Sequence, residues 1–80
     1  MKEFKYSRHA KNRMRLHKIS EDEVEECLTA PELQEKSIHG RVNRWKKVRD
    51  RYLRVTIKEE ANKVIIVTAV MKKHMGGKQS

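Results

Sequence analysis

Lys63-Val-Ile-Ile-Val-Thr-Ala-Val-Met71 is the one stretch of this 80-residue chain in which apolar residues run almost without interruption. The run is short and rich in β-branched side chains, which favours a strand over a helix. In an extended strand one face carries Val64, Ile66 and Val70, and the other carries Ile65, Val67 and Ala69. A strand that is apolar on both faces is typical of the interior of a sheet. We therefore expect residues 63–71 to lie centrally in a sheet, covered on both faces.

Length and charge limit the class of protein. Eighty residues form one domain with a small core, because a chain of this size buries only about 60% of its unfolded surface. Twenty Lys and Arg residues oppose eleven Asp and Glu, which gives a net charge of +9. Such an excess points to a polyanionic partner, and RNA or DNA is the first candidate. A membrane surface or an acidic protein is the alternative, and many small basic proteins are merely soluble.

The cysteine content and the lengths of the apolar runs bear on the compartment. Cys27 is the single cysteine, so neither an intramolecular disulfide nor a zinc site of several cysteines can form. Its apolar position in a predicted helix favours a small buried side chain over a nucleophile. No apolar run reaches transmembrane length, and no signal peptide precedes the predicted fold. We therefore expect a cytoplasmic protein.

The first third of the chain predicts a short strand and two helices. Residues 4–6 alternate as in a strand, and Ser7 offers an N-cap for a helix over residues 8–17. The apolar stripe of that helix consists of Ala10, Met14 and His17.

The second helix has the clearest start signal in the chain. Ser20 and Glu23 form a capping box, and Ile19 and Val24 form a hydrophobic staple around it. Pro31 ends this helix, because the residue before a proline avoids helical geometry. Its apolar face carries Val24, Cys27 and Leu28.

After Pro31 the apolar period changes towards two, which predicts strands. We expect an edge strand over 33–38, a turn at His39-Gly40, and strands over 41–48 and 52–58 before the apolar strand. In the strand over 52–58 the core-facing residues are Leu53, Val55 and Ile57, and the residues that point away are Tyr52, Arg54, Thr56 and Lys58. The connecting turns fall at 48–51 and 59–62, with Asn62 suited to a left-handed backbone.

The order of these elements predicts the fold class. Strand, two helices and four strands (β-α-α-β-β-β-β) indicate an α+β domain with the helical pair packed on one face of a mainly antiparallel sheet. The domain spans residues 1–73. Residues 74–80 show no apolar periodicity, and we expect them to form a flexible basic tail.

One candidate site is a ridge along the first helix. His9, Arg13 and His17 are four residues apart, so they line one side of that helix. They can form a phosphate-facing ridge with groups that titrate near neutrality, or they can be ordinary solvated residues, which spacing alone favours. The eight-residue separation of the two histidines argues against a zinc site, and we expect no metal.

A second candidate is the basic segment over residues 41–54, which holds seven cations and two aromatic residues. Cations bind backbone phosphates, and aromatic faces stack on exposed bases. The proposed nucleic-acid contacts are Arg44, Trp45, Lys46, Lys47 and Arg51, beside Tyr52 and Arg54. Alternatively, Trp45 only covers a thin core and the cations keep a sheet edge soluble. The overall basicity favours the binding interpretation.

Some of these residues also suit metal-free RNA cleavage. That reaction needs a base for the 2′-hydroxyl proton, an acid for the leaving oxygen and cations for the phosphorane charge. His9, Tyr52, Lys46 and Arg54 have the right chemistry, although their spacing does not show that they converge. The sequence has no P-loop, no glycine-rich dinucleotide turn and no acidic cluster for magnesium, so we expect no cofactor.

The N-terminal half resembles a known family. His9-Ala-Lys-Asn-Arg13-Met14 followed by Ile19-Ser20 and Val24 resembles the opening of a small uncharacterised bacterial and archaeal domain. Gly40-Arg41, residues 52–55 and the final strand through Thr68 resemble its later parts. This domain is similar to the RelE/ParE-like toxin superfamily, with BrnT as a near neighbour.

The resemblance implies a compact RelE-like α+β domain and a ribonuclease toxin, free or ribosome-dependent, or an inactive relative of one. His9 and Arg13 match residues of the family motif, whereas His17 stands where the family usually has a second arginine. RelE-type toxins cut RNA with Arg, Lys and Tyr on the sheet, and Arg44, Lys46, Tyr52 and Arg54 are the candidates here.

Three functional hypotheses follow. The first is a toxin-like protein of a toxin-antitoxin system that binds RNA, ribosome-bound or free, and cleaves it without metal. In it His9 or Tyr52 handles protons, and phosphate is held by Arg13, Arg44, Lys46 and Arg54. The second is a nucleic-acid-binding module without catalysis. The third is a protein-interaction module whose basic face docks an acidic antitoxin-like chain.

Overall fold

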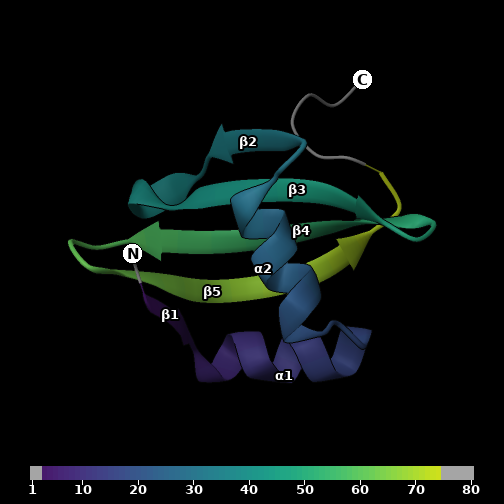
Figure 1. Cartoon of the computed structure of the whole chain (residues 1–80), viewed down its shortest axis with the longest axis horizontal. Helices are drawn as coiled ribbons and strands as arrows, with labels where there is room; N and C mark the ends of the chain where they lie inside the picture. Colours follow the sequence, from purple (N-terminus) through teal and green to yellow (C-terminus); the bar gives the residue numbers. More distant parts are fainter. Residues whose placement is uncertain (1–2, 75–80) are drawn as a thin grey trace.

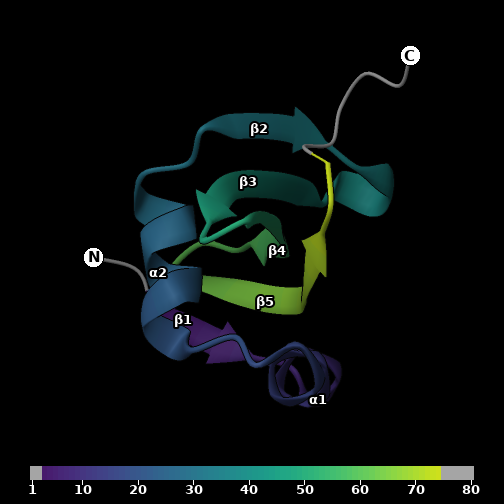
Figure 2. The same cartoon turned by 90° about the vertical axis from the view of Figure 1, so that its right-hand side faces the viewer.

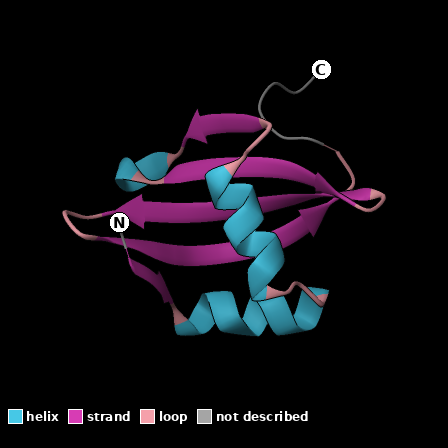
Figure 3. Cartoon of the chain, viewed as in Figure 1, coloured by secondary structure: helices cyan, strands magenta, loops and turns pink. Residues whose placement is uncertain are grey.

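The strands form a single sheet, and two well-capped helices pack on it. The computed structural model describes residues 3–74. The elements are β1 (Glu3–Tyr6), α1 (Arg8–His17), α2 (Glu21–Thr29), β2 (Leu33–Lys36), the short 3-10 helix η1 (Ile38–Gly40), β3 (Val42–Val48), β4 (Arg51–Glu59) and β5 (Lys63–Lys72) (Figures 1 and 3). The predicted order of strands and helices is confirmed.

Capping at both ends sets the length of α1. The Ser7 hydroxyl oxygen accepts the Ala10 N–H at 3.0 Å and its hydroxyl donates to the Val67 carbonyl of β5 at 2.9 Å. At the other end Lys18 takes a left-handed backbone with φ of 58°, and the Ile19 N–H donates to the Met14 carbonyl at 2.8 Å. This is the arrangement in which a glycine is usual, so Lys18 carries some backbone strain there.

The predicted capping box of α2 is present in both directions. The Ser20 hydroxyl accepts the Glu23 N–H at 3.1 Å, and the Glu23 carboxylate accepts the Ser20 N–H at 3.0 Å. The residues of the staple, Ile19 and Val24, are both buried. Acidic residues fill the first turn, where they interact favourably with the helix dipole. The helix ends at Thr29, two residues before Pro31.

The strands form one sheet in the order β1-β5-β4-β3-β2. β1 pairs with β5 in parallel, and the other neighbours are antiparallel. The apolar strand β5 is therefore interior, as predicted, although β4 occupies the middle of the sheet. β1 pairs only with residues 63–66 of β5, and α1 runs beside the rest of that strand (Figure 1).

The core lies between the sheet and the helices. α2 crosses the face formed by β4 and β3, and α1 packs on β5 (Figure 2). From the sheet the core takes Leu53, Val55, Ile57, Val64, Ile66 and Ala69, and from the helical segment it takes Ala10, Met14, Ile19, Val24, Cys27 and Leu28. The predicted inward face of β4 and the apolar face of α2 are both confirmed.

One part of the β5 prediction is wrong. Thr56 pairs with Thr68, but the next residue of β4, Ile57, pairs with Ile66. Val67 is thus an extra residue that reverses the alternation beyond it. Ala69 is buried and Val70 is half-buried, so each of these two residues lies on the face of β5 opposite to the one expected. The second face of β5 is only partly covered, not fully as predicted.

Smaller differences concern the turns. Residue 38 belongs to η1 and not to the strand before it. In the described part of the chain the left-handed non-glycine positions are Lys18, His39 and Arg49, and Asn62 is not among them. The tail predicted over 74–80 lies, except for His74, outside the described residues. Among the described helices, none has the length and apolar character needed to cross a membrane.

The capping box makes a measurable contribution to stability. We expect Ser20→Ala to lower the free energy of unfolding by about 1 kcal/mol, because the Glu23 N–H loses its partner. Urea denaturation measures this change. Ser37→Ala is the matched control, since Ser37 precedes η1 without a capping hydrogen bond from its side chain. Equal losses in the two variants would contradict the assigned cap.

The buried Cys27 thiol makes the free energy of unfolding depend on pH in the alkaline range. Burial raises the pKa of its thiol from 9.0 to about 11. Below pH 9 the folded and unfolded states are both protonated at this group. As pH rises from 9 towards 11, only the unfolded state loses the proton, so the contribution of Cys27 to stability falls across this window. We expect wild type to lose more stability than Cys27→Ala between pH 8.5 and about 11 in urea titrations. Parallel pH profiles would contradict the assignment.

Candidate functional site

The pairing register divides the basic segment between two faces of the sheet. β3 and β4 are antiparallel, with Trp45 opposite Arg54 and Lys46 opposite Leu53. Side chains alternate along each strand, so Trp45 and Arg54 share one face while Lys46 lies on the core side with Leu53. We call the face turned away from α2 the far face (Figure 2).

An arginine lies over a tryptophan in the middle of the far face. The guanidinium carbon of Arg54 is 5.9 Å from the centroid of the Trp45 ring, which is within cation–π range. Trp45 is only 4% exposed, and its ring N–H donates to the Glu35 carboxylate at 3.1 Å. Trp45 therefore serves as a fixed platform beneath Arg54 and does not present a free ring to solvent.

Arg54 itself has unused binding capacity. Its Nε is buried and has no hydrogen-bond partner, and within residues 3–74 no carboxylate forms an ion pair with it. On the neighbouring strand the Thr68 hydroxyl is also buried and unpartnered. Buried polar groups without partners are rare, so their occurrence on this face marks it as a candidate site.

Next to Arg54 a row of three residues crosses the sheet. Tyr52 pairs with Lys47 on β3 and with Lys72 on β5. Tyr52 is half-buried, whereas both lysines are exposed. The far face therefore holds one aromatic ring between two cations, beside the unpaired Arg54. We call Lys47, Tyr52, Arg54 and Lys72 the far-face group.

Arg44 and Lys46 lie on the helix side and hold the C-terminal end of α2. Arg44 donates through Nη1 to the Leu28 carbonyl at 3.0 Å and through Nε to Gln34 at 2.7 Å. Lys46 donates to the Ala30 carbonyl at 3.2 Å. Cations at a helix C-terminus satisfy free carbonyls and oppose the helix dipole. The structure thus separates these two residues from Tyr52 and Arg54.

Of the three residues of the predicted ridge on α1, one lies at a pocket. His9 and Arg13 are exposed on α1, and Tyr52 and Arg54 lie on the far face of β4, so the proposed catalytic residues come from separate elements. His17, at the end of α1, is half-buried and lines a pocket with Arg51.

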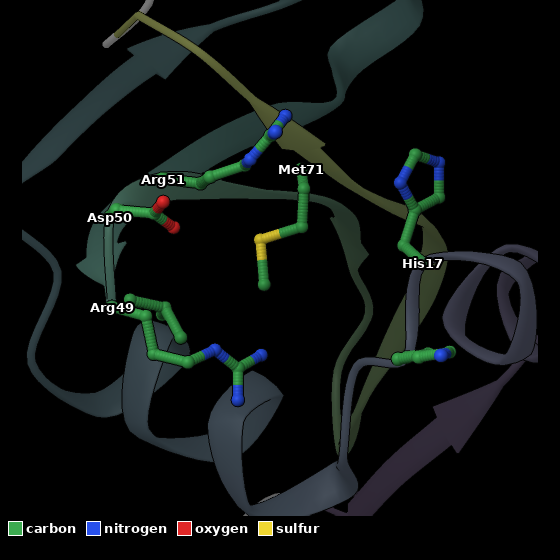
Figure 4. A pocket seen from close by; sticks show the side chains of 7 residues that line it. His17, Arg49, Asp50, Arg51 and Met71 are labelled. Carbon is green, nitrogen blue, oxygen red and sulfur yellow. The ribbon is translucent and has the colours of Figure 1, made fainter.

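This pocket, which we call the end pocket, has a volume of about 290 Å³ and is formed by three separate segments. They are the end of α1, the β3–β4 turn and the end of β5. The lining residues are His17, Lys18, Val48, Arg49, Asp50, Arg51 and Met71. Figure 4 shows the Met71 side chain between His17 on one side and Asp50 and Arg49 on the other.

Sequence reasoning missed Lys18 and Arg49 as members of this pocket. Both have a left-handed backbone, with φ of 58° at each residue. Arg49 is also tied to α2, because its Nη1 lies 3.3 Å from the Glu23 carboxylate. Their positions in the sequence could have indicated this, because Lys18 directly follows the predicted helix and Arg49 begins the two-residue turn between β3 and β4.

A second hollow, of about 660 Å³, lies between β1 and the start of α2. Burial, and then the charges of Glu21, Glu25 and Asp22, raise the pKa of the Tyr6 phenol to about 12. The Tyr6 hydroxyl is buried without a partner. The hollow carries acidic and basic residues together, so its charge favours no class of ligand.

The described residues include no group of three or more His, Cys, Asp and Glu side chains that could hold a metal ion. The far face and the end pocket together present cations, one phenol, one imidazole and the Asp50 carboxylate. Such groups bind anions and transfer protons.

Comparison with known proteins shows a family but no characterised relative. No curated protein and no solved structure matches the chain. One family model, described as a domain of unknown function (DUF4258), matches residues 6–71. That range runs from the end of β1 almost to the end of β5 and includes both helices. The chain therefore belongs to the DUF4258 family.

Proposed function

We propose that this protein binds single-stranded RNA on the far face of its sheet. The observation that carries the proposal is Arg54, a half-buried guanidinium with no ion pair among the described residues, fixed over Trp45. A phosphate group offers acceptor oxygens to this guanidinium, and charge-assisted hydrogen bonds of this kind are the strong ones. The net charge of +9 draws a polyanion to the surface.

The other members of the far-face group give this surface the features of a single-strand site. Lys47 and Lys72 flank Tyr52, so cations lie on either side of an aromatic ring. Bases stack on aromatic rings while lysines follow the phosphates. Tyr52 is the ring available for stacking, because Trp45 is buried beneath Arg54. The choice of RNA over DNA rests on the resemblance to RelE-type and BrnT-type toxins.

Metal-independent cleavage of that RNA is the second candidate function. The observation that favours it is that Tyr52 and Arg54 share one face, two residues apart on β4. In such a reaction a base takes the proton of the 2′-hydroxyl, the 2′-oxygen attacks the phosphorus, the 5′-oxygen leaves with a proton from an acid, and a 2′,3′-cyclic phosphate remains. Tyr52 would carry one of these two protons, and Arg54 would stabilise the phosphorane charge. His9 on α1 remains the other proposed proton carrier.

RNA binding is tested first with substitutions on the far face. We expect Arg54→Ala to weaken binding of a single-stranded RNA roughly tenfold, the effect of losing a charged hydrogen bond worth ~1.5 kcal/mol. Lys47→Ala should reduce the slope of log affinity against log salt by about 1. Trp45, the single tryptophan, gives an intrinsic fluorescence signal for the titration.

Arg44→Gln is the matched variant for this test. It should leave RNA affinity unchanged and lower the midpoint of urea denaturation, because Arg44 holds the Leu28 carbonyl on the other side of the sheet. Unchanged affinity and salt slope in Arg54→Ala and Lys47→Ala would refute binding on the far face. Equal weakening by Arg44→Gln would do the same.

Cleavage is tested by incubating the protein with single-stranded RNA in EDTA. We expect products with cyclic phosphate ends and a loss of 10²-fold or more in rate for Tyr52→Phe, the usual effect of removing a general acid or base. An otherwise identical oligonucleotide with 2′-deoxy sugars should remain intact. His9→Ala tests the other proton carrier in parallel. Saturating binding with no cleavage by wild type would establish a binding protein without this activity.

A further inference from the structure

We propose that the end pocket binds a phosphate group. Its permanent charges are three cations, Lys18, Arg49 and Arg51, and one carboxylate, Asp50. Glu23 takes up part of the positive charge from outside, through its ion pair with Arg49. The pocket itself keeps an excess of positive charge, and His17 adds a hydrogen-bond donor in either protonation state.

The shape of the pocket favours a small anion over a stretch of chain. Its volume of about 290 Å³ is just below the range of small-molecule sites, roughly 300–1,000 Å³. Met71 and Val48 supply apolar surface, and a thioether accepts hydrogen bonds only weakly. Asp50 is the single carboxylate among the lining residues. A phosphate group adds acceptor oxygens that suit guanidinium groups.

The backbone supplies a second, independent argument. Lys18 and Arg49 both have φ of 58°, a conformation that costs an ordinary residue more than it costs glycine. They come from different turns, yet both residues line the same pocket. Glycine at either position would relieve strain but would remove a cation from the pocket. Strained backbone that positions charged groups is typical of functional sites.

The ion pair of Arg49 links the pocket to α2. One oxygen of the Glu23 carboxylate accepts the Ser20 N–H, and the other contacts Arg49 at 3.3 Å. The same side chain therefore caps α2 and contacts the β3–β4 turn. The Arg49 side chain is 64% exposed, and an exposed ion pair of this kind is weak, so the guanidinium stays accessible to a bound anion.

Two sources can supply the phosphate. One is the terminal phosphate of a bound RNA strand, because Arg51 of the pocket directly precedes Tyr52 of the far-face group; this source rests on the proposed function. The other is a free phosphate or a nucleotide, which does not depend on RNA binding. The chemistry of recognition is the same in both cases.

The first experiment titrates inorganic phosphate into the ¹⁵N-labelled protein and follows its amide signals. We expect saturable shifts at residues 17, 18 and 49–51, and at least tenfold weaker binding in Arg51→Gln and in Lys18→Gly. Lys18→Gly should at the same time raise the urea midpoint, since glycine removes the left-handed strain. The matched control, Lys36→Gln, removes one exposed cation outside the pocket and should bind phosphate as wild type does.

The second experiment identifies the source. Three versions of one single-stranded RNA carry a 5′-phosphate, a 3′-phosphate or hydroxyl ends. A terminal source predicts several-fold tighter binding of one phosphorylated version and loss of that gain in Arg51→Gln, whereas Arg54→Ala weakens all three versions. If adding phosphate shifts the amide signals of the pocket but no phosphorylated RNA binds more tightly, the source is the free anion.

Several outcomes overturn the proposal. One is that phosphate shifts amide signals over the whole basic surface. Another is that Lys36→Gln and Arg51→Gln weaken phosphate binding equally. Unchanged phosphate binding in both Arg51→Gln and Lys18→Gly would also overturn it. These results concern the pocket alone, because RNA binding that is lost in Arg54→Ala but retained in Arg51→Gln still supports the far face. The failures of the two proposals are therefore distinguishable.

Discussion

The alternation of side chains along β4 is the constraint on which the rest of the structure depends. β4 is the middle strand, so the same residues decide what the helices pack on and what the far face displays. Leu53, Val55 and Ile57 are fully buried beneath the helical layer. Tyr52 and Arg54 must then point to the other side. A slip of one residue would exchange the two sets and remove both the core and the far-face group.

Because side chains alternate in the same way along β3, which pairs with β4, basic residues that are close in sequence have different roles. Arg44 and Lys46 bind carbonyls at the end of α2, whereas Lys47 and Arg54 face away from it. Part of the positive charge of the chain thus stabilises a helix. Composition alone cannot make this division, since each residue in the segment contributes equally to the net charge.

Most of the elements could be predicted because their signals are local. The capping box at Ser20 and the proline at position 31 mark both ends of α2, and period-two alternation marks β4. The extra residue at Val67 could not be predicted, because no glycine or proline marks it and its register depends on pairing with β4. The same limit applies to the sites. Strand period places Tyr52 and Arg54 on one face, but only the fold brings Lys18 and Arg49 to one pocket.

The parallel pairing of β1 with β5 has a consequence for how the protein forms during synthesis. β1 lies near the start of the chain, and its partner residues, 63–66, are made about sixty residues later. The Ser7 N–H and hydroxyl also bind β5, at the Ile66 and Val67 carbonyls. Long-range pairing of this kind makes folding slow compared with local contacts. The first strand and the start of α1 can therefore take their final places only once residues 63–67 have been made.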